Sequence, residues 1–296
     1  MGTVSEWQEK EASLTLLYDN IRWEEKAIYE SAKKKNVNIV NTDCKKLILD
    51  LNEKNSNYKN EVIIQRCVSY FKNVHSTAAL EGLGARLINP LNTAIFCGNK
   101  LFTHVILQNT GIKTPKVMSA FSYESAIKAI EKLGYPVIIK PTVGSWGRLI
   151  GLIKDKDAAK IVLEDREHMF PLYQIYYLEE FVRRPPRDIR AIVIDNEVVA
   201  AIYRYTGDSK EWKTNMALGG RAQNCPITNE LEDICIKATK AVKGKIVGVD
   251  LMESLKDGLL VHEINNTTEF KNTVKVTGTK IQDLIVDFAI RYKKEI

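Results

Sequence analysis

The sequence has 296 residues, of which 45% are hydrophobic and 27% are charged. The length allows about two domains of ordinary size, and the balance excludes a disordered or fibrous protein. No uninterrupted apolar run approaches the ~20 residues that cross a bilayer, so no membrane association is expected. Lys and Arg exceed Asp and Glu by 43 to 37, and this net charge of +6 fits either an anionic partner or a solvated, Lys-rich surface.

The N-terminus and the cysteines both point to the cytoplasm. Residues 1–12 are polar and acidic, unlike a secretory signal, and are expected to form an N-terminal extension. The five cysteines form no CxxC pair. An odd number without that spacing disfavours a disulfide framework or a zinc site and favours a reducing compartment.

Strands alternate with helices in the first third of the chain. Apolar runs predict strands at 14–18, 37–40, 61–65 and 86–88, and amphipathic patterns predict helices at 23–34 and 75–83. This alternation favours a small parallel α/β domain over residues 13–93. The domain contains no GxGxxG sequence, so a dinucleotide-binding Rossmann domain is not expected.

Two further α/β segments are expected, at 94–178 and 179–296. In the first, the pattern predicts helices at 99–108, 123–133 and 157–168, and strands at 135–141, 149–153 and 174–182. In the second, it predicts an antiparallel hairpin of 188–194 with 198–205, helices at 229–243 and 278–292, and strands at 246–252 and 259–265. The Asp195-Asn196 pair is a typical hairpin turn.

A loop with two glycines, residues 142–148, separates two of these strands. Backbone N–H groups near Gly144 and Gly147 can approach phosphate oxygens because no Cβ blocks them, although hairpin tips often carry glycines without any ligand. The loop lacks the GK[ST] ending of a P-loop. Lys140 ends an apolar strand and Lys100 precedes a helix; each alone is more often solvated, but with the loop they suggest a nucleotide clamp.

The strongest group of candidate ligands lies near the C-terminus. Asp250 is inside an otherwise apolar strand, and Glu263 and Asn265 project to one side of another, since residues i and i+2 share a face. If the two strands pair, three oxygen ligands suited to Mg²⁺ meet on one face. The alternative is an exposed polar face, but buried acids in central strands need a cation or partners.

Arginines on the hairpin are candidates for holding an anionic reaction centre. Asp188 and Arg190 share one strand face, and Arg204 ends the partner strand. Guanidinium donors match carboxylate or phosphate oxygens, while a structural salt bridge is an equally good interpretation of the spacing. No HxxxH spacing, GxSxG elbow or cysteine in a catalytic context was found, and His104 is expected to be a packed helix residue.

The order of these motifs resembles the ATP-grasp ligases, whose α/β fold has three subdomains. The resemblance covers about residues 13–294 and includes Glu179-Glu180-Phe181-Val182 and Asp188-Ile189-Arg190. It is closest to the branch that adds amino acids to a protein C-terminus. Within that branch, residues 144–149, 215–220 and 269–272 resemble the ligases of lysine biosynthesis that act on a carrier protein.

The resemblance implies a role for each matching residue. ATP would be bound by Lys100, Lys140, the loop residues Gly144, Ser145, Trp146, Gly147 and Arg148, and the hinge residues Glu179, Glu180, Phe181 and Val182. Two Mg²⁺ ions would be held by Asp250, Glu263 and Asn265. The acyl phosphate would be surrounded by Arg190, Arg204 and Asn215. The amino-acid pocket would be shaped by Asn266, Thr267, Thr268, Glu269, Phe270 and Asn272.

The same resemblance implies the substrates and partners. The terminal glutamate of an acidic, LysW-type amino-group carrier protein would be activated by ATP and joined to the α-amine of α-aminoadipate. The segment before Glu269 lacks the proline, and the position after Lys271 lacks the glycine, that the glutamate-using relatives tend to carry, which favours aminoadipate. A homodimer or homotetramer is expected, and no nucleic-acid partner.

Four alternatives stay open from the sequence. The first is a glutamate–carrier ligase of arginine biosynthesis, because one methylene is worth only ~1–3 kcal/mol of discrimination. The second is a glutamate ligase acting on another C-terminus, such as that of a ribosomal protein. The third is a nonenzymatic ATP-binding module, which the presence of all three metal-ligand candidates disfavours. The fourth is a nucleic-acid binder, suggested by the charge alone.

Overall fold

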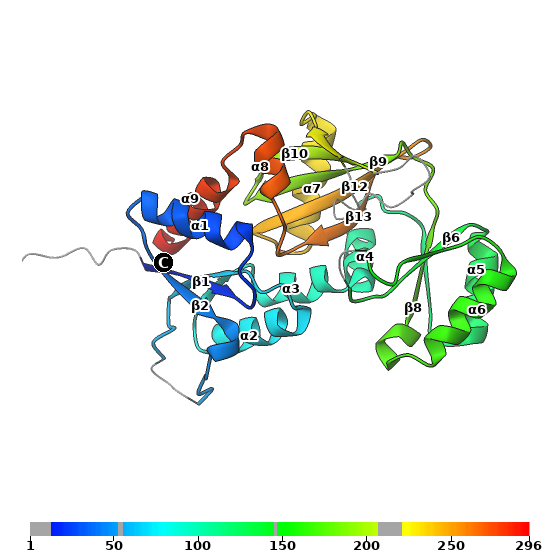
Figure 1. The fold of residues 1–296 in the computed structure, drawn as a ribbon, viewed down its shortest axis with the longest axis horizontal. Helices are drawn as coiled ribbons and strands as arrows, with labels where there is room; N and C mark the ends of the chain where they lie inside the picture. Colours follow the sequence, from blue (N-terminus) through cyan, green and yellow to red (C-terminus); the bar gives the residue numbers. More distant parts are fainter. Residues whose placement is uncertain (1–12, 53–55, 145–146, 207–220, 296) are drawn as a thin grey trace, which may run out of the picture. The chain divides into compact units, whose positions relative to one another are not determined.

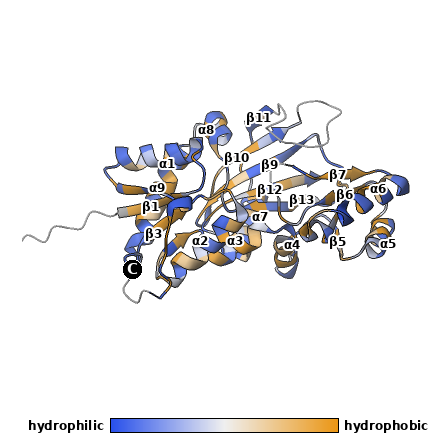
Figure 2. Cartoon of the chain, turned by 60° about the horizontal axis from the view of Figure 1, so that its bottom comes forward, coloured by the Kyte–Doolittle hydropathy of each residue, from blue (hydrophilic) through white to orange (hydrophobic). Residues whose placement is uncertain are grey.

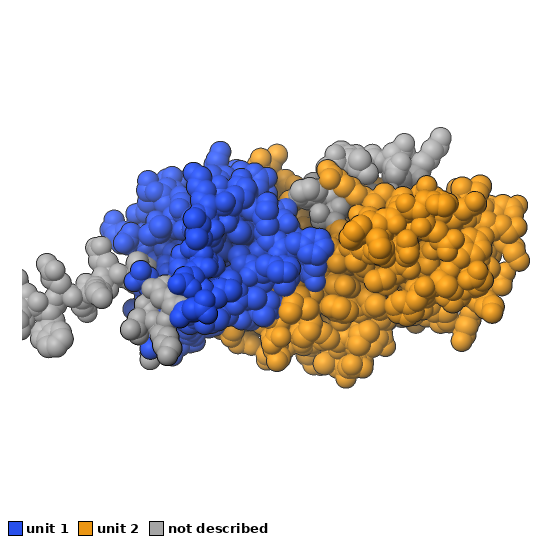
Figure 3. Space-filling view, turned by 90° about the horizontal axis from the view of Figure 1, so that it is seen from below, with its two compact units in different colours: residues 1–91, 280–296 blue, residues 92–279 orange. Residues whose placement is uncertain are grey.

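The computed structural model describes residues 13–52, 56–144, 147–206 and 221–295. By its contacts the chain forms two compact units, residues 1–91 with 280–296, and residues 92–279, coloured separately in Figure 3. The boundaries expected at 12/13, 93/94 and 178/179 stay predictions. Within the described ranges no helix is both long enough and apolar enough to span a bilayer.

The first unit is built on a parallel sheet with strand order β2-β1-β3-β4. Its strands are β1 (Ser13–Tyr18), β2 (Asn38–Asp43), β3 (Val62–Gln65) and β4 (Arg86–Ile88), and its other elements are α1 (Trp23–Lys34), η1 (Cys44–Lys46), α2 (Tyr70–Gly82) and α9 (Ile281–Lys294). Strand β3 is buried along its whole length, as expected for a parallel strand covered on both faces. Figure 1 shows α1 and α9 on one side of this sheet and α2 on the other.

Helix α9 returns from the end of the chain to complete the first unit. It packs against α1 and β3, and its apolar face is buried, including Ile285 and Phe288. Ser31 on α1 donates a hydrogen bond to Asp283 at 2.6 Å, and Arg86 on β4 donates to the carbonyl of Tyr292 at 2.8 Å. The amphipathic pattern predicts the helix, but only these tertiary contacts reveal where it lies.

The second unit contains two antiparallel sheets. The smaller has the order β5-β8-β6-β7, formed by β5 (Val117–Ala120), β6 (Val137–Lys140), β7 (Gly151–Ile153) and β8 (Tyr176–Glu180). Helices α5 (Tyr123–Leu133) and α6 (Lys156–Glu167) cover one face through a core that includes Ile130, Ile139 and Leu163. Because side chains alternate along β6, Lys140 faces away from that core.

The larger sheet has the order β11-β10-β9-β12-β13. Its strands are β9 (Arg187–Ile194), β10 (Glu197–Tyr205), β11 (Arg221–Asn224), β12 (Ile246–Ser254) and β13 (Gly258–Asn265). Helices α4 (Lys100–Asn109) and α7 (Asn229–Ala241) pack on one face, around Val249, Leu251 and Ile264. The remaining elements of this unit are α3 (Leu91–Gly98), η2 (Pro171–Gln174) and α8 (Lys271–Thr277). Figure 2 shows hydrophobic residues concentrated on the strands and many hydrophilic ones on α1 and α6.

Most predicted elements are confirmed, and the ones that were missed are short. Trp23–Lys34, Arg86–Ile88 and Tyr123–Leu133 coincide with their predicted ranges, and the predicted hairpin turn places Asp195 at φ +57°. The sequence analysis did not predict α3, α8, β5 or β11. Each spans between four and eight residues, too few for a hydrophobic period to stand out.

Candidate nucleotide and metal site

The two strands that carry the predicted metal ligands are paired, as the metal hypothesis required. In the antiparallel register of β12 and β13, Asp250 lies directly opposite Glu263, and Asn265 lies opposite Gly248. A bulge follows at once, because Leu251 pairs with Val261 and His262 is the extra residue. Asp250, Glu263 and Asn265 therefore lie on one face of the sheet, opposite to the face that packs on α4 and α7.

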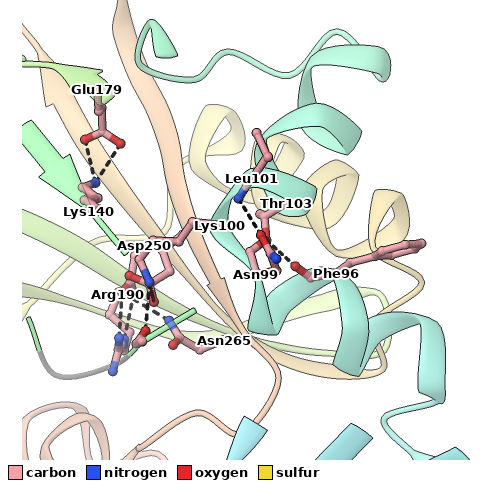
Figure 4. A network of polar contacts seen from close by, with 12 residues as sticks. Phe96, Asn99, Lys100, Leu101, Thr103, Lys140, Glu179, Arg190, Asp250 and Asn265 are labelled. Carbon is pink, nitrogen blue, oxygen red and sulfur yellow. Dashed lines mark hydrogen bonds and ion pairs between the residues drawn. The ribbon is translucent and has the colours of Figure 1, made fainter. Parts of the chain in front are cut away.

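Four side chains of alternating charge lie in a row across this face and are called the ion ladder here: Arg190, Asp250, Arg204 and Asp188. Arg190 holds both carboxylate oxygens of Asp250, at 2.8 Å through Nε and 2.7 Å through Nη2 (Figure 4). Arg204 donates through Nε to Asp188 at 2.6 Å and lies 3.1 Å from Asp250 through Nη2. Asn265 donates its amide N–H to Asp250 at 3.3 Å. The structure thus brings together four residues predicted for two different roles, with Asp188 as their neighbour.

The ladder keeps its buried members charged. Burial alone would raise the pKa of Asp250, but Arg190 and Arg204 outweigh it and hold that pKa well below the ordinary value. Burial would lower the pKa of Arg204, but Asp188 and Asp250 raise it above its usual range. Asp250 is therefore an anion at neutral pH, as a metal ligand must be.

The donor set fits a hard divalent cation. Glu263 is 28% exposed, and the Lys100 ammonium lies 3.7 Å from its carboxylate. Asn265 uses its N–H toward Asp250, so its amide oxygen is left as a ligand. Two carboxylates and one amide oxygen suit Mg²⁺, which takes its other ligands from water and phosphate. Across the described ranges, no group of three or more His, Cys, Asp or Glu side chains is placed to hold a metal ion, and this candidate depends on two carboxylates and one amide.

Lys100 connects the metal-ligand face to the glycine-bearing loop. Asn99 caps α4 by accepting the N–H of Leu101 at 3.0 Å, which places Lys100 at the first turn. Its backbone N–H donates to the carbonyl of Thr142, and its Nζ donates to the carbonyl of Gly144 at 2.9 Å while lying 3.7 Å from Glu263. A phosphate held at the loop would therefore lie beside the carboxylates.

Lys140 and Glu179 form a buried ion pair on neighbouring strands of the smaller sheet. The ammonium of Lys140 lies 2.6 and 2.7 Å from the two oxygens of Glu179 (Figure 4), and the Glu179 side chain is fully buried. Two residues predicted to bind ATP are thus in contact, with the carboxylate neutralising the ammonium. A buried pair of this kind stays in place because losing one partner leaves an uncompensated charge.

The loop and the hinge contain the other predicted ATP contacts. Gly147 has φ +69°, a conformation that favours glycine, and Arg148 is exposed. Ser145 and Trp146 lie outside the described residues, as does Asn215. In the hinge, Glu180 accepts the backbone N–H of Lys116 at 2.7 Å. Phe181 is half-buried, and Val182 packs with Met252 and Leu260 in a small apolar cluster.

The predicted amino-acid-binding segment approaches β12 closely at Thr268. A Cβ on Gly248 would lie 2.3 Å from Oγ1 of Thr268, so only glycine fits beneath that side chain. Thr268 and Phe270 are buried and Asn266 and Thr267 half-buried, whereas Glu269 and Asn272 are exposed. Their contacts with an amino acid stay predictions.

Two polar residues of this region were missed as site residues by the sequence analysis. Asp188 was noted only as part of a pair, yet it is buried and accepts from Arg204. The ring nitrogens of His262 are shielded from solvent and have no hydrogen-bond partner among the described residues. Burial and the nearby ammonium of Lys140 hold the pKa of His262 well below the ordinary value, so the ring is neutral. The extra residue of a bulge has no signature in the sequence pattern.

Comparisons with known proteins agree with this geometry. The RimK-like ATP-grasp domain model matches residues 97–289, and the LysX preATP-grasp domain model matches residues 14–96. The alpha-aminoadipate–LysW ligase LysX of Sulfurisphaera tokodaii is 36% identical over 285 residues, covering 92% of this chain and 96% of that protein. The glutamate–LysW ligase ArgX of the same organism is 33% identical, covering 93% and 97%.

A solved structure supports the fold. The RimK domain ATP-grasp protein of Sphaerobacter thermophilus superposes with a TM-score of 0.75 at 19% identity, covering 94% of this chain and all of that one. With this fold and these family matches, the chain belongs to the RimK-like ATP-grasp family, is an ATP-dependent carboxylate–amine ligase, and carries a LysX-type preATP-grasp domain.

Proposed function

We propose that this protein joins the α-amine of α-aminoadipate to the γ-carboxyl of the C-terminal glutamate of a LysW-type carrier protein, using ATP, in lysine biosynthesis. The observation that carries the proposal is the single polar face on which Asp250, Glu263, Arg190 and Arg204 meet, with Lys100 linking it to the glycine-bearing loop. The LysX relative, whose name states this activity, matches over nearly the whole chain.

The proposed reaction has two steps. A carboxylate oxygen of the carrier attacks the γ-phosphorus of ATP, which forms an acyl phosphate and releases ADP. The amine of aminoadipate then attacks the acyl carbon, the carbon–oxygen bond to phosphate breaks, and the amine gives up a proton as the amide forms. Positioning and charge compensation supply most of the acceleration in such transfers.

Each part of the site has an expected task in this reaction. Lys100 and Lys140 contact the nucleotide phosphates, with the loop over residues 144–148 beside them. Hinge residues Glu179, Glu180, Phe181 and Val182 bind the adenine and the ribose. The donors of Arg190, Arg204 and Asn215 hold the acyl phosphate, as planar guanidinium groups suit phosphate oxygens. The segment 266–272 binds the amino acid.

Mg²⁺ would be held by Asp250, Glu263 and Asn265, and two ions are expected there. When bound, the ions offset negative charge on the phosphates. Glu263 can take part readily, because the Lys100 ammonium lies 3.7 Å from it, beyond hydrogen-bond distance.

Mass spectrometry of the carrier tests the proposal. The purified enzyme is incubated with carrier, ATP, Mg²⁺ and either aminoadipate or glutamate, and kcat/KM is measured for each amino acid. We expect one aminoadipate per carrier and a preference of about tenfold or more, the scale of one methylene. A carrier that lacks its terminal glutamate is the control and should stay unmodified.

The second candidate is the glutamate–carrier ligase of arginine biosynthesis. The ArgX relative matches almost as much of the chain at 33% identity, and an enzyme that separates substrates by one methylene needs few residue changes. A higher kcat/KM for glutamate than for aminoadipate would favour this second candidate over the first. Modification of an unrelated acidic C-terminus, with the carrier left untouched, would favour a ligase of the ribosomal-protein type instead.

A further inference from the structure

The carboxylates that a metal ion would bind are already paired with cations of the protein. Among the described residues of this face, the cations Lys100, Arg190 and Arg204 are matched by the carboxylates of Asp188, Asp250 and Glu263. These pairs leave no excess negative charge to attract a divalent cation, and Arg184 adds a further positive charge near Asp188 and Arg204. An ion placed beside Asp250 is repelled by the guanidinium groups a few ångströms away, because a protein surface screens charges much less than bulk water does.

Asp250 keeps at most one acceptor position, on Oδ1, because three donor contacts fall on Oδ2. Its Oδ1 accepts from Arg190, and its Oδ2 accepts from Arg190 and from Asn265 and lies 3.1 Å from Arg204. A carboxylate offers about four acceptor positions in all. A metal can therefore reach only the remaining Oδ1 position, beside the Arg190 guanidinium, and coordination through Oδ2 or through both oxygens requires a donor to leave.

Arg190 is the donor that can leave. Arg204 is anchored a second time by Asp188, at 2.6 Å, and would keep its position. Arg190 has Asp250 as its one ion-pair partner in the described part of the chain, and its side chain is 16% exposed against 11% for Arg204. Turning the Arg190 guanidinium away therefore breaks a single bidentate contact.

We infer that Arg190 is an exchangeable counter-ion of Asp250: it occupies the carboxylate while the site holds no metal, a divalent cation takes its place, and the released guanidinium becomes available to the anionic reaction centre. This inference rests on the metal ligands proposed above. It makes Arg190 a competitor of the metal in the nucleotide-free protein, and it links the delivery of a phosphate-binding arginine to the arrival of the ion.

The inference has a consequence opposite to that of a supporting residue. A side chain that merely orients a metal ligand weakens metal binding when it is removed. Removal of a competing counter-ion strengthens metal binding. The sign of the change in metal affinity therefore separates the two roles, without any measurement of catalysis.

The experiment measures Mn²⁺ binding to the full-length, nucleotide-free protein by the loss of free Mn²⁺ signal in electron paramagnetic resonance. We expect wild type to bind weakly and Arg190→Gln to bind about tenfold more tightly, ~1.4 kcal/mol. Arg190→Lys, which keeps the charge but loses the bidentate contact, should fall between them. In Arg190→Gln with Asp250→Asn the gain should vanish, since the effect acts through Asp250.

Arg187→Gln is the matched control. Arg187 lies on the same strand and makes the same kind of bidentate pair, at 2.6 and 2.8 Å, but with Glu253, outside the ladder. Its substitution should leave Mn²⁺ affinity at the wild-type value. Thermal melting of every variant confirms that it is folded, and Arg190→Lys carries the test if Arg190→Gln does not fold.

The outcomes separate this inference from the proposed function. Loss of Mn²⁺ binding in Glu263→Gln, together with unchanged or weaker binding in Arg190→Gln, overturns the counter-ion role and keeps the metal assignment. Mn²⁺ binding that survives Glu263→Gln and Asp250→Asn alike removes the metal assignment itself. Tighter binding in both Arg190→Gln and Arg187→Gln reduces the effect to total charge and also overturns the inference.

Discussion

At the scale of single residues, Gly248 sets how closely the segment 266–270 approaches the sheet. Its missing Cβ leaves the room that the Thr268 hydroxyl occupies, and both residues lie beside the strand positions of the metal-ligand candidates. Packing this close is intolerant of one added methyl group, because interiors are filled to crystal-like density.

We predict that Gly248→Ala destabilises the protein by ~1–3 kcal/mol through overpacking against Thr268. The displaced segment should also raise the KM for the amino acid more than that for ATP. Urea denaturation and steady-state kinetics check the two effects.

Gly82→Ala is the matched control, because a Cβ there meets nothing within 4 Å and alanine favours the end of a helix over glycine. Adding Thr268→Ala to Gly248→Ala should restore part of the stability. A Gly248→Ala protein as stable as wild type would contradict the close packing.

Residue types and their spacing predicted which residues form the site but not which of them form ion pairs with one another. Alternation along β13 puts Glu263 and Asn265 on one face, and the position of Asp250 in an apolar strand predicts it as their partner if the strands pair. That Arg190 occupies Asp250, and that Lys140 is clamped by Glu179, depends on the register between strands far apart in sequence. A one-residue shift of register would move each of these side chains to the other face, and no local pattern encodes it.

At the scale of elements, a buried ion pair connects α1 to the residue that follows β3. Arg66, just after β3, lies 3.0 Å from Glu25 on α1, and Arg22 before the helix lies 2.8 Å from the same carboxylate. Burial alone would raise the pKa of Glu25, but Arg66 and Arg22 outweigh it and lower that pKa below its ordinary value of 4.5.

We predict that Glu25→Gln lowers the free energy of unfolding by ~1–3 kcal/mol at pH 7, since it removes the carboxylate that Arg66 and Arg22 share, while Glu24 still offsets part of the Arg66 charge. The folded-state pKa is lowered, so the contribution of the carboxylate is fully present above 4.5 and is lost as the pH falls through the folded value. The difference between variant and wild type should therefore shrink in acid.

Urea denaturation at a series of pH values measures that difference. Glu30→Gln, an exposed position on the same helix, should change stability little at any pH, because surface substitutions usually lie within ~0.5 kcal/mol. A difference for Glu25→Gln that stays constant into acid would show that the carboxylate charge is not what fastens α1.

At the scale of the whole molecule, the first unit is assembled from both ends of the sequence. Residues 280–296 belong with residues 1–91, while the second unit is continuous from 92 to 279. The metal-ligand candidates, the ion ladder and the glycine-bearing loop all lie within that continuous unit. Sequence periodicity located α9 but assigned it to the C-terminal segment, because the pattern reports an apolar face and not its partner.

We predict that removing residues 280–296 unfolds the first unit and leaves the second folded. The loss exposes apolar surface on α1 and β3 that α9 covers. Hydrogen exchange should show amides of β1, β3 and β4 losing protection while those of β9 and β12 keep theirs. Loss of protection in both sets at once would show that the two units unfold together.

The position of α9 at the C-terminus also affects the order in which the two units can fold during synthesis. The strands of the first unit emerge from the ribosome long before the helix that closes it, and translation of the intervening ~190 residues takes roughly 10–40 s. During that interval the second unit can fold on its own contacts, whereas the surface of α1 and β3 that α9 covers stays exposed. We therefore expect the second unit, although it is made later, to complete its folding during synthesis before the first unit does.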